Sequence, residues 1–390
     1  KLKMRVSVNA WFLQQPYTGS GQYVRHLLPA LTRVAPTLDV VPLLPAPRAG
    51  HRAEAPLAAR RAHHVGLPGW LTPADLRKVW WEQVAWLRAA RGRAADVAHV
   101  PYFAPPLWAP RPLVVTIHDL IPLILPEYVT RPHVRLYNTL ISLAARRAAQ
   151  IIADSQATAD DIVRRLGITA QRIHVVPLAA APGMQPLANG TQRQAILRRF
   201  GLDQPFIFYI GGFDSRKNVP ALLRAFHALP AELRQRHALA IAGAAPGPHN
   251  PRLFPPLRPL ADALGLGDRV RFLGRVTEEE KRALYSAATL FVFPSRHEGF
   301  GLDPLEAMAC GAPVLASNRS SLPEVVGGGA ALVDPTDHAA FTRALAALLD
   351  SPRRRADLSK RGSSVAATFS WERTAAMTLE VYRQARARER

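Results

Sequence analysis

Residues 293–311 read FPSRHEGFGLDPLEAMACG, and this stretch is the most informative part of the chain. An apolar strand ends at Pro294, a loop with two glycines follows, and a short helical pattern comes next. Asp303 is expected to cap that helix, Pro304 suits its first turn, and Gly311 can end it. A strand, a loop and a helix in this order form one step of an alternating α/β fold.

The loop and the start of the helix carry candidate binding groups. The backbone N–H groups of Gly299 to Leu302 lie near a helix N-terminus, where phosphate and sugar hydroxyl oxygens bind readily. Glu298 and Glu306 lie eight residues apart. Glu306 has two interpretations that the spacing leaves open: it could complete a capping box with Asp303, or it could accept hydrogen bonds from a ribose.

A second stretch, residues 209–218, reads YIGGFDSRKN and lies between a predicted strand and a predicted helix. Glycines such as Gly212 let the backbone approach a ligand closely. Arg216 and Lys217 supply positive charge for a diphosphate, the first through a planar fork and the second as a point charge. A solvated basic turn is the alternative, and the spacing does not match a Walker loop.

A third stretch, residues 115–122, reads VTIHDLIP and ends a strand of the first half. Ligands of open parallel sheets bind beyond such strand ends, so His118 could contact a sugar hydroxyl or a phosphate. A structural histidine is the equal alternative. The loop Gly19-Ser20-Gly21 follows the first strand, and Gly19 and Gly21 offer backbone donors as a weaker signal.

Strands and helices alternate along the whole chain, which predicts doubly wound parallel sheets. Helices are expected at 157–166 with Ser155 as the cap, at 192–200, at 219–228 and at 371–385. The expected strands are 4–9, 38–44, 97–100, 113–117, 150–153, 173–176, 206–210, 239–242, 270–273, 290–293 and 314–316.

The chain length of 390 residues suits two domains. A stretch rich in proline and glycine between about 177 and 204 reads as a linker. We therefore expect a first Rossmann-like domain at 1–185 and a second Rossmann-like domain at 186–370. A final helix is expected at 371–390.

The charge of the chain is strongly positive, with a formal net value of +21. Such a field favours anionic partners, namely nucleic acid, an acidic membrane surface or phosphorylated ligands. The arginines are scattered along the chain, so a surface that is arginine-rich throughout, without a specific anionic partner, is an equal alternative. No nucleic-acid reader motif is present, and we expect no nucleic-acid partner.

Cysteine content and apolar runs limit the remaining classes. Cys310 is the single cysteine, which excludes an internal disulfide and leaves a nucleophile poorly supported. No uncharged apolar run reaches 18 residues, and the start of the chain reads as a strand rather than a signal peptide. The expected location is the cytoplasm, with a peripheral position at the inner face of the membrane as an extension.

The motifs occur along the chain in an order that is similar to that of a known family. A glycine loop, His118-Asp119, the segment from Gly211 to Asn218, the pair Glu298 and Glu306, and Phe369-Ser370-Trp371 follow one another along nearly the whole chain. This set resembles the retaining glycosyltransferases of family four. The resemblance implies the GT-B fold, in which two Rossmann-like domains of the α/β class face each other across a cleft that holds the donor. It also implies that the domain at 1–185 binds the acceptor and that the domain at 186–370 binds the nucleotide sugar. The helix at 371–390 would cross back to the first domain.

The resemblance also implies residue roles. Arg216 and Lys217 would hold the donor diphosphate and stabilise the leaving group, while Glu298 would contact hydroxyls of the transferred sugar. Glu306 would bind the ribose and His118 would face the sugar. Backbone around Phe300, Gly301 and Leu302 would touch the sugar or phosphate, and the segment containing Val276 would lie along the nucleobase.

The implied activity is hexosyl transfer with retention from a nucleotide sugar to a glycan or lipid-linked acceptor. GDP-mannose is the first donor candidate, on likeness to bacterial mannosyltransferases, and UDP-sugars come next. No Asp-x-Asp pair and no clustered metal ligands occur, so we expect neither a metal nor a resident cofactor.

A different class of function must be weighed beside this one. A basic, Trp-bearing helix at about 74–90 could lie on an anionic membrane, with Leu76, Val79 and Trp80 on its apolar side. The chain would then be a membrane-surface or nucleic-acid-binding protein that uses the Rossmann-like domains without catalysis. An ordinary core helix with solvated basic residues is the simpler alternative for this segment.

Overall fold

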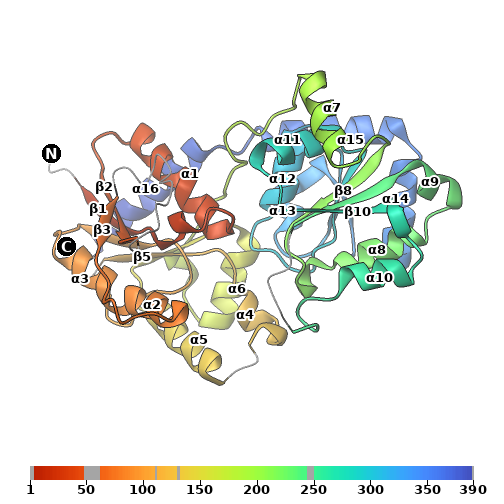
Figure 1. Cartoon of the computed structure of the whole chain (residues 1–390). Coiled ribbons are helices and arrows are strands. Elements are labelled where there is room, and N and C mark those ends of the chain that lie inside the picture. Colours follow the sequence, from red (N-terminus) through yellow and green to blue (C-terminus); the bar gives the residue numbers. More distant parts are fainter. Residues whose placement is uncertain (1–3, 48–61, 110–111, 130–131, 244–249, 389–390) are drawn as a thin grey trace. The chain divides into compact units, whose positions relative to one another are not determined.

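The computed structural model describes residues 4–47, 62–109, 112–129, 132–243 and 250–388. The chain divides into two compact units. The first contains the residues up to Leu178 together with those from Ser370 onward, and the second contains Ala179–Phe369. The last helix therefore belongs to the same unit as the first strand (Figure 1).

The described residues of the first unit form a seven-stranded parallel sheet in the order β3-β2-β1-β4-β5-β6-β7. Side chains of its central strands are fully buried on both faces, as expected for a parallel sheet covered by helices. Its strands are β1 Arg5–Asn9, β2 Asp39–Pro45, β3 His63–Val65, β4 Val97–Val100, β5 Leu113–Ile117, β6 Gln150–Ala153 and β7 Ile173–Val175.

Helices cover both faces of this sheet. The first and the last helix pack against each other on one face, and the remaining long helices cover the other (Figure 1). The helices are α1 Gly19–Val34, α2 Ala74–Trp80, α3 Trp86–Arg91, α4 Ile121–Ile124, α5 Pro132–Ala145, α6 Gln156–Leu166 and α16 Trp371–Ala387. A π-helical turn at Trp81–Ala85 joins α2 to α3.

A buried hydrogen-bond network ties the last helix to the first sheet. His99 on β4 lies 2.8 Å from the Tyr382 hydroxyl through Nδ1 and 2.9 Å from the Thr116 hydroxyl through Nε2. The Thr116 hydroxyl in turn lies 3.2 Å from the hydroxyl of Tyr23 on α1. Burial lowers the pKa of His99 to about 3, so this histidine is neutral and can both donate and accept.

The described residues of the second unit form a six-stranded parallel sheet in the order β10-β9-β8-β11-β12-β13. Chain order reverses between β8 and β11, which makes this pair the switch point of the sheet. The strands are β8 Phe206–Ile210, β9 Ala238–Ala242, β10 Val270–Gly274, β11 Leu290–Phe293, β12 Val314–Ser317 and β13 Ala331–Val333.

Two helical layers enclose the second sheet. One contains α8, α10 and α14, and the other contains α7, α11, α12 and α15 (Figure 1). The helices are α7 Gly190–Arg199, α8 Val219–His227, α9 Ala231–Arg236, α10 Leu257–Ala263, α11 Glu278–Ala287, α12 Leu302–Ala309, α13 Leu322–Val326, α14 His338–Leu349 and α15 Pro352–Ala366.

Local sequence signals account for several helix ends. The Ser155 side chain accepts a hydrogen bond from the N–H of Thr158, which confirms the predicted cap of α6. Thr18 caps α1 in the same way through the N–H of Gly21, so Gly19 and Gly21 lie in the first turn of a helix. The expected loop at these glycines is therefore wrong, because Thr18 starts the helix before them.

Two short strands were missed by the pattern of apolar residues. β3 and β13 have only three residues each, and their side chains are exposed or half-buried. Edge strands of this kind lack the continuous apolar run that marks a central strand. No helix in the described parts of the chain combines the length and apolar character needed to cross a bilayer.

Candidate active site

The switch point between β8 and β11 brings two of the motifs together. The loop after β8 contains Gly212 and leads into a 3-10 turn at Ser215–Lys217. The loop after β11 contains Glu298 and leads into α12. Because both strands are parallel and adjacent, their carboxyl ends and both loops lie at the same sheet edge.

A cluster of paired charges occupies this edge. Oε1 of Glu298 lies 2.8 Å from Nη1 of Arg216 and 2.8 Å from Nζ of Lys217. It also accepts a hydrogen bond from the Ser295 hydroxyl at 2.6 Å. Nε of Arg216 pairs with Oδ1 of Asp214 at 3.2 Å. The structure thus joins Arg216, Lys217 and Glu298 in one group and adds Asp214 and Ser295, which the sequence analysis did not single out.

All three predicted side chains of this cluster are held away from bulk water. The Lys217 side chain is 9% exposed, and its ammonium lies 4.7 Å from the centre of the Phe293 ring. Burial alone would raise the pKa of Glu298, but the charges of Arg216 and Lys217 outweigh it and lower the pKa to about 2. Glu298 is therefore ionised at neutral pH and fixes the positions of both cations.

The loop that carries Glu298 is anchored from the next strand of the sheet. The hydroxyls of Ser320 and Ser321 lie 2.6 and 3.0 Å from the Glu298 carbonyl oxygen. Both serines follow β12 and were not predicted as site residues. They fix the backbone of the loop at the point where the side chain of Glu298 turns toward the cations.

Helix α12 begins two residues earlier than expected, at Leu302, with Gly301 in the cap position. Gly301 has a φ of 109°, and a Cβ there would lie 2.6 Å from Cδ2 of Leu322, so only glycine fits. The prediction that Asp303 caps this helix is wrong, because the left-handed glycine reverses the chain before it. The N–H groups of Leu302 and its neighbours remain at the helix start, where they lack intrahelical partners.

Glu306 lies in a second charged pair on the inner side of α12. Its Oε2 lies 2.8 Å from Nζ of Lys281 on α11, and its Oε1 accepts the N–H of Ala181 at 3.3 Å. The capping-box alternative is therefore wrong, since the helix starts too early for Glu306 to reach its cap. Burial raises the pKa of Glu306, and the charge of Lys281 opposes that rise.

Asp303 lies in the first turn of α12, where the charges of both groups act on it. Burial raises the pKa of its carboxyl, while Lys217 and Lys281 act to lower it. A carboxylate at this position adds negative charge beside the cations. The sequence analysis assigned Asp303 only a capping role, because the lysines whose charges act on it are distant in the chain.

The remaining predicted residues of the second unit lie in loops and turns at strand ends. Val276 is half-buried in the turn between β10 and α11, directly before the Thr277 cap. Phe300 is buried, and its ring meets the edge of Phe369 with centroids 5.9 Å apart. Gly212 accepts a hydrogen bond on its carbonyl from the Tyr209 hydroxyl at 2.6 Å.

His118 belongs to the first unit, where it forms a buried pair with Asp154. Its Nδ1 lies 2.7 Å from Oδ2 of Asp154, and its Nε2 lies 3.1 Å from the carbonyl oxygen of Pro101. Burial acts to lower the pKa of His118, but the charge and hydrogen bond of Asp154 raise it above the ordinary value. Both ring nitrogens therefore have protein acceptors, and the Pro101 contact must open before Nε2 can bind any other group.

Two further possibilities are a nucleophilic Cys310 and a cluster of metal ligands. Burial raises the pKa of Cys310 to about 12, which disfavours the thiolate and the nucleophile alternative. Within the residues that the structure describes, no group of three or more His, Cys, Asp or Glu side chains is arranged to hold a metal ion.

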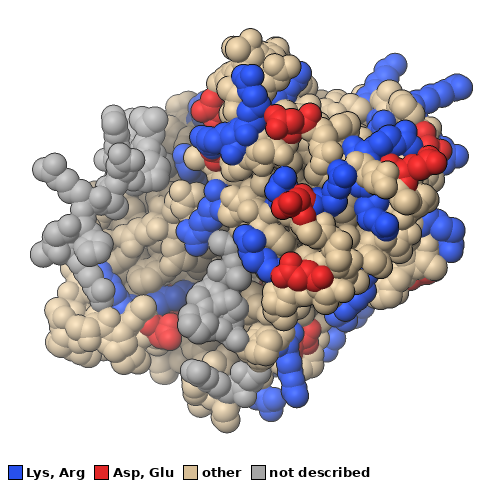
Figure 2. All heavy atoms as spheres, turned by 45° about the vertical axis from the view of Figure 1, so that its right-hand side comes forward, with Lys and Arg blue, Asp and Glu red and all other residues tan. Residues whose placement is uncertain are grey.

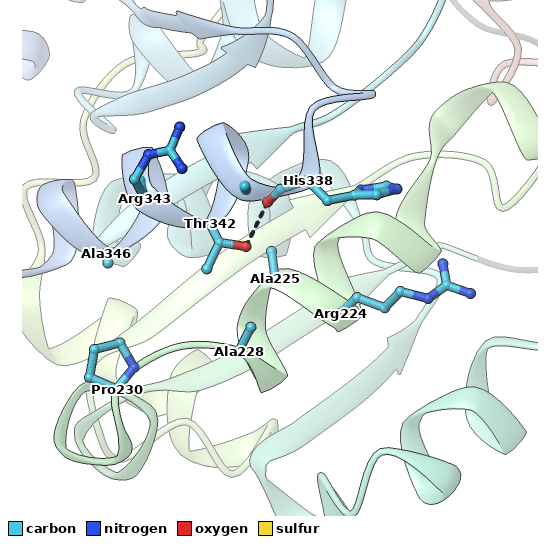
Figure 3. Close-up of a pocket in the computed structure, with 9 residues that line it drawn as sticks. Arg224, Ala225, Ala228, Pro230, His338, Thr342, Arg343 and Ala346 are labelled. Carbon is cyan, nitrogen blue, oxygen red and sulfur yellow. Dashed lines mark hydrogen bonds between the residues drawn. The ribbon is translucent and has the colours of Figure 1, made fainter.

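A depression of about 600 Å³ lies elsewhere in the second unit, between α8 and α14 (Figure 3). Its basic side chains are Arg224, His338 and Arg343. Arg343 points away from Arg224 and His338 in Figure 3, so these groups do not converge on one point. The depression contains none of the predicted site residues and is lined mainly by alanine, proline and the stems of the basic side chains.

Comparison with solved structures identifies the class of the fold. The chain superimposes on sucrose-phosphate synthase from Thermosynechococcus elongatus with a TM-score of 0.76 and 21% sequence identity. The match covers 99% of this chain and 100% of that one. Two parallel-sheet α/β units with this likeness define the GT-B fold.

Two family models and two curated relatives identify the family. The model described as Glycosyltransferase Family 4 matches residues 17–180, and the model described as Glycosyl transferases group 1 matches residues 193–365. The O-antigen chain mannosyltransferase B of Escherichia coli is 34% identical over 289 residues, which cover 72% of this chain and 74% of that protein. The chain belongs to glycosyltransferase family four and resembles bacterial mannosyltransferases.

A second relative is considerably longer than this chain. The serotype-specific mannosyltransferase WbdA of Escherichia coli is 34% identical over 270 residues, which cover 68% of this chain. The aligned region covers 33% of the length of that protein, so this chain matches about a third of it.

The charge pairing of Glu298 predicts a specific acid sensitivity. The pKa of Glu298 lies at about 2 in the folded state, below its ordinary value of 4.5, so the pair stabilises the fold fully above pH 4.5. This stabilisation, about 3 kcal/mol, is lost as the pH falls from about 5 toward 2. Denaturant unfolding across this pH range should show wild type losing about that much more stability than Glu298→Gln.

Glu380→Gln is the matched control, because it removes an exposed carboxylate whose ion pair with Arg383 is 54% exposed on the Glu380 side. Such a pair contributes little, and the control should follow wild type at every pH. Parallel stability curves for wild type and Glu298→Gln would contradict the assigned pairing.

The second prediction concerns the histidine pair of the first unit. Asp154→Asn removes the negative charge that raises the pKa of His118 and leaves the burial that lowers it. The pKa of His118 should therefore fall below the ordinary histidine value. Proton NMR titration of the imidazole signals between about pH 5 and 8 measures this shift.

His99 is an internal control in the same spectra. Its pKa of about 3 keeps it neutral across the titration in wild type and variant alike. An unchanged His118 titration in Asp154→Asn would show that another group sets its charge.

Proposed function

We propose that this glycosyltransferase moves a hexose, with mannose as the first candidate, from a nucleotide diphosphate donor to a glycan or lipid-linked acceptor. The observation that carries the proposal is the cluster of Arg216, Lys217 and Glu298 at the carboxyl edge of β8 and β11. This edge is the switch point of the second sheet, where open α/β sheets bind their ligands.

Charge development during the reaction explains why two cations are needed. Cleavage of the anomeric bond leaves negative charge on the diphosphate and positive charge on the sugar. Arg216 and Lys217 are already desolvated and oriented by Glu298, so they can stabilise the leaving group without reorganising. An ammonium has three donors, and the Glu298 contact of Lys217 uses one of them.

Glu298 and Glu306 complete the proposed donor contacts. Glu298 would accept hydrogen bonds from hydroxyls of the transferred sugar while it keeps the cations in position. Glu306 would bind the ribose, with Lys281 holding its carboxylate ionised through the 2.8 Å contact. The resemblance to family four implies that His118 contacts the sugar, and its Nε2 would first have to leave the carbonyl of Pro101.

The proposed donor is GDP-mannose, supported by the two Escherichia coli relatives whose names specify mannosyl transfer. A UDP-sugar is the second candidate. Retention of anomeric configuration rests on the resemblance to family four. A lipid-linked acceptor would bring the enzyme to a membrane surface, and we propose peripheral contact with anionic lipid there.

Substitution of the two cations tests the proposal directly. Arg216→Ala and Lys217→Ala should each lower kcat for transfer by roughly 10²- to 10³-fold, comparable to the loss of one transition-state donor. The assay is sugar transfer or donor hydrolysis over a panel of GDP- and UDP-sugars. Arg353→Ala and Lys360→Ala are matched controls on the exposed surface of α15 and should behave as wild type.

The outcome for the double variant is decisive. Near-wild-type transfer by Arg216→Ala/Lys217→Ala, with the circular dichroism spectrum of a folded protein, would contradict the role of these two side chains in binding the diphosphate. A loss of activity confined to one donor of the panel would instead identify the preferred nucleotide sugar.

A further expectation is that transfer needs no divalent metal. Arg216, Lys217 and the N–H groups at the start of α12 would supply the positive potential that a metal supplies in other transferases. Activity should persist in excess EDTA, apart from ionic-strength effects. Activity that is lost with EDTA and restored by magnesium or manganese would contradict this chemistry.

A further inference from the structure

Helix α5 exposes an apolar stripe on its outer face. Leu136, Leu140 and Leu143 are 61%, 36% and 45% exposed and follow one another at positions i, i+4 and i+7. Its inner face packs on the core through Ile141 and its alanines. A helix on the surface of a soluble domain normally turns polar residues outward, so this stripe requires a partner or an explanation.

An exposed tryptophan extends the stripe at the end of the helix. Trp108 is 73% exposed, and the carbonyl of the preceding Leu107 accepts a hydrogen bond from Nη1 of Arg147 at 3.2 Å. Arg147 lies one turn beyond Leu143, so the loop is fixed beside the last turn of the helix. We call Leu136, Leu140, Leu143 and Trp108 the α5 face.

The neighbouring helical run adds further exposed apolar side chains. The Tyr137 hydroxyl on α5 donates a 2.6 Å hydrogen bond to Glu82 in the π-helical turn, which holds the two helices together (Figure 1). Leu76 and Val79 on α2 are 57% and 38% exposed, and Trp70 lies before them at 68%.

These two helices and their loops hold most of the exposed apolar surface. Among the described residues, ten large apolar side chains are exposed, and seven of them belong to this part of the first unit. The remaining three are Tyr17, Val163 and Leu332. The expected interfacial helix at 74–90 is thus only half exposed, since Trp81, Trp86 and Leu87 are buried.

The charge around the α5 face is positive. The sequence from 128 to 153 contains four arginines and no Asp or Glu. Arg135 and Arg147 donate to backbone carbonyls, and neither forms an ion pair with a carboxylate of the described residues. Over the face drawn in Figure 2, basic and acidic side chains lie interspersed. Arginines without a carboxylate partner, next to exposed apolar side chains, fit the interface of an anionic membrane. There the acyl chains lie beneath negatively charged headgroups.

We propose that the α5 face docks on an anionic lipid bilayer, with α5 lying in the plane of the interface. The leucines and Trp108 would enter the acyl boundary, and Arg135 and Arg147 would meet lipid phosphates. The helix has 14 residues, fewer than the roughly 20 needed to span a bilayer. This surface rests on the proposed function, because a lipid-linked acceptor would place the enzyme at a membrane. All of its residues belong to the first unit.

A second copy of the chain fits this surface less well. A symmetric contact would bring the same uncompensated arginines of two copies against each other, which is unfavourable in a desolvated interface. Lipid phosphates instead supply the opposite charge. Charge complementarity therefore favours the bilayer over self-association.

Vesicle sedimentation with the full chain tests the proposal. Wild type should bind phosphatidylcholine vesicles that contain phosphatidylglycerol and bind pure phosphatidylcholine weakly. Leu136→Ser/Leu140→Ser/Leu143→Ser should lower the partition coefficient at least about tenfold. Arg135→Gln/Arg147→Gln should weaken binding to the anionic vesicles and reduce its salt dependence. Val163→Ser/Leu332→Ser removes exposed apolar side chains elsewhere and should bind as wild type.

Separate readouts keep the outcomes distinct. All variants should keep the wild-type melting temperature, because the substituted side chains are exposed. Absence of wild-type binding to anionic vesicles, or equal binding by the triple leucine variant, overturns the docking proposal. A dimer in sedimentation velocity that the triple variant abolishes also overturns it and assigns the face to self-association.

Donor hydrolysis in solution, measured without vesicles, separates this inference from the proposed function. If donor hydrolysis is intact but vesicles are not bound, the docking proposal is contradicted and the proposed donor chemistry is not. If vesicles are bound but no nucleotide sugar is hydrolysed, the proposed chemistry is contradicted and the docking proposal is not.

Discussion

The pairing of β8 with β11 in a parallel sheet is the constraint on which the candidate site depends. Arg216 and His297 are 81 positions apart in the chain, yet Nη1 of Arg216 donates to the His297 carbonyl at 3.1 Å. The N–H of Arg296 donates in return to the Arg216 carbonyl at 2.7 Å. Backbone and side-chain bonds thus lock the two loops together before any ligand is present. Because a parallel sheet places every carboxyl strand end at one edge, the same pairing that builds the core also assembles the cations.

Electrostatics then decides what this edge can hold. A nearly buried ammonium such as that of Lys217 is costly unless a carboxylate compensates it, and Glu298 supplies that compensation to Lys217 and Arg216 together. Asp214 balances Arg216 further, so two carboxylates already accompany the two cations. A diphosphate must therefore share these partners rather than meet unopposed positive charge. The gain for the proposed chemistry is orientation, since the cations are fixed where leaving-group charge would develop.

Sequence reasoning recovered the fold well where the determinants are local. Central strands such as β4, β5 and β11 begin and end where their apolar runs do, and Ser155 caps α6 as its position indicates. It failed where a distant residue or an unusual backbone angle decides. Gly301 starts α12 through a φ of 109°, which displaced the cap expected at Asp303. Lys281 and Asp154 escaped notice because their partners, Glu306 and His118, are brought to them only by the packing of neighbouring elements.

The buried network of the first unit shows how a distant element can bear on a candidate catalytic side chain. Tyr382 on α16 contacts His99, His99 contacts Thr116, and Thr116 contacts the hydroxyl of Tyr23. The Tyr23 ring meets His118 edge-on, with centroids 4.9 Å apart and an interplanar angle of 78°. A side chain held on one edge by Tyr23 and at both nitrogens by Asp154 and Pro101 has little rotational freedom. Helix α16, to which the chain returns after the second unit, therefore connects to His118 through three buried hydrogen bonds and one ring contact.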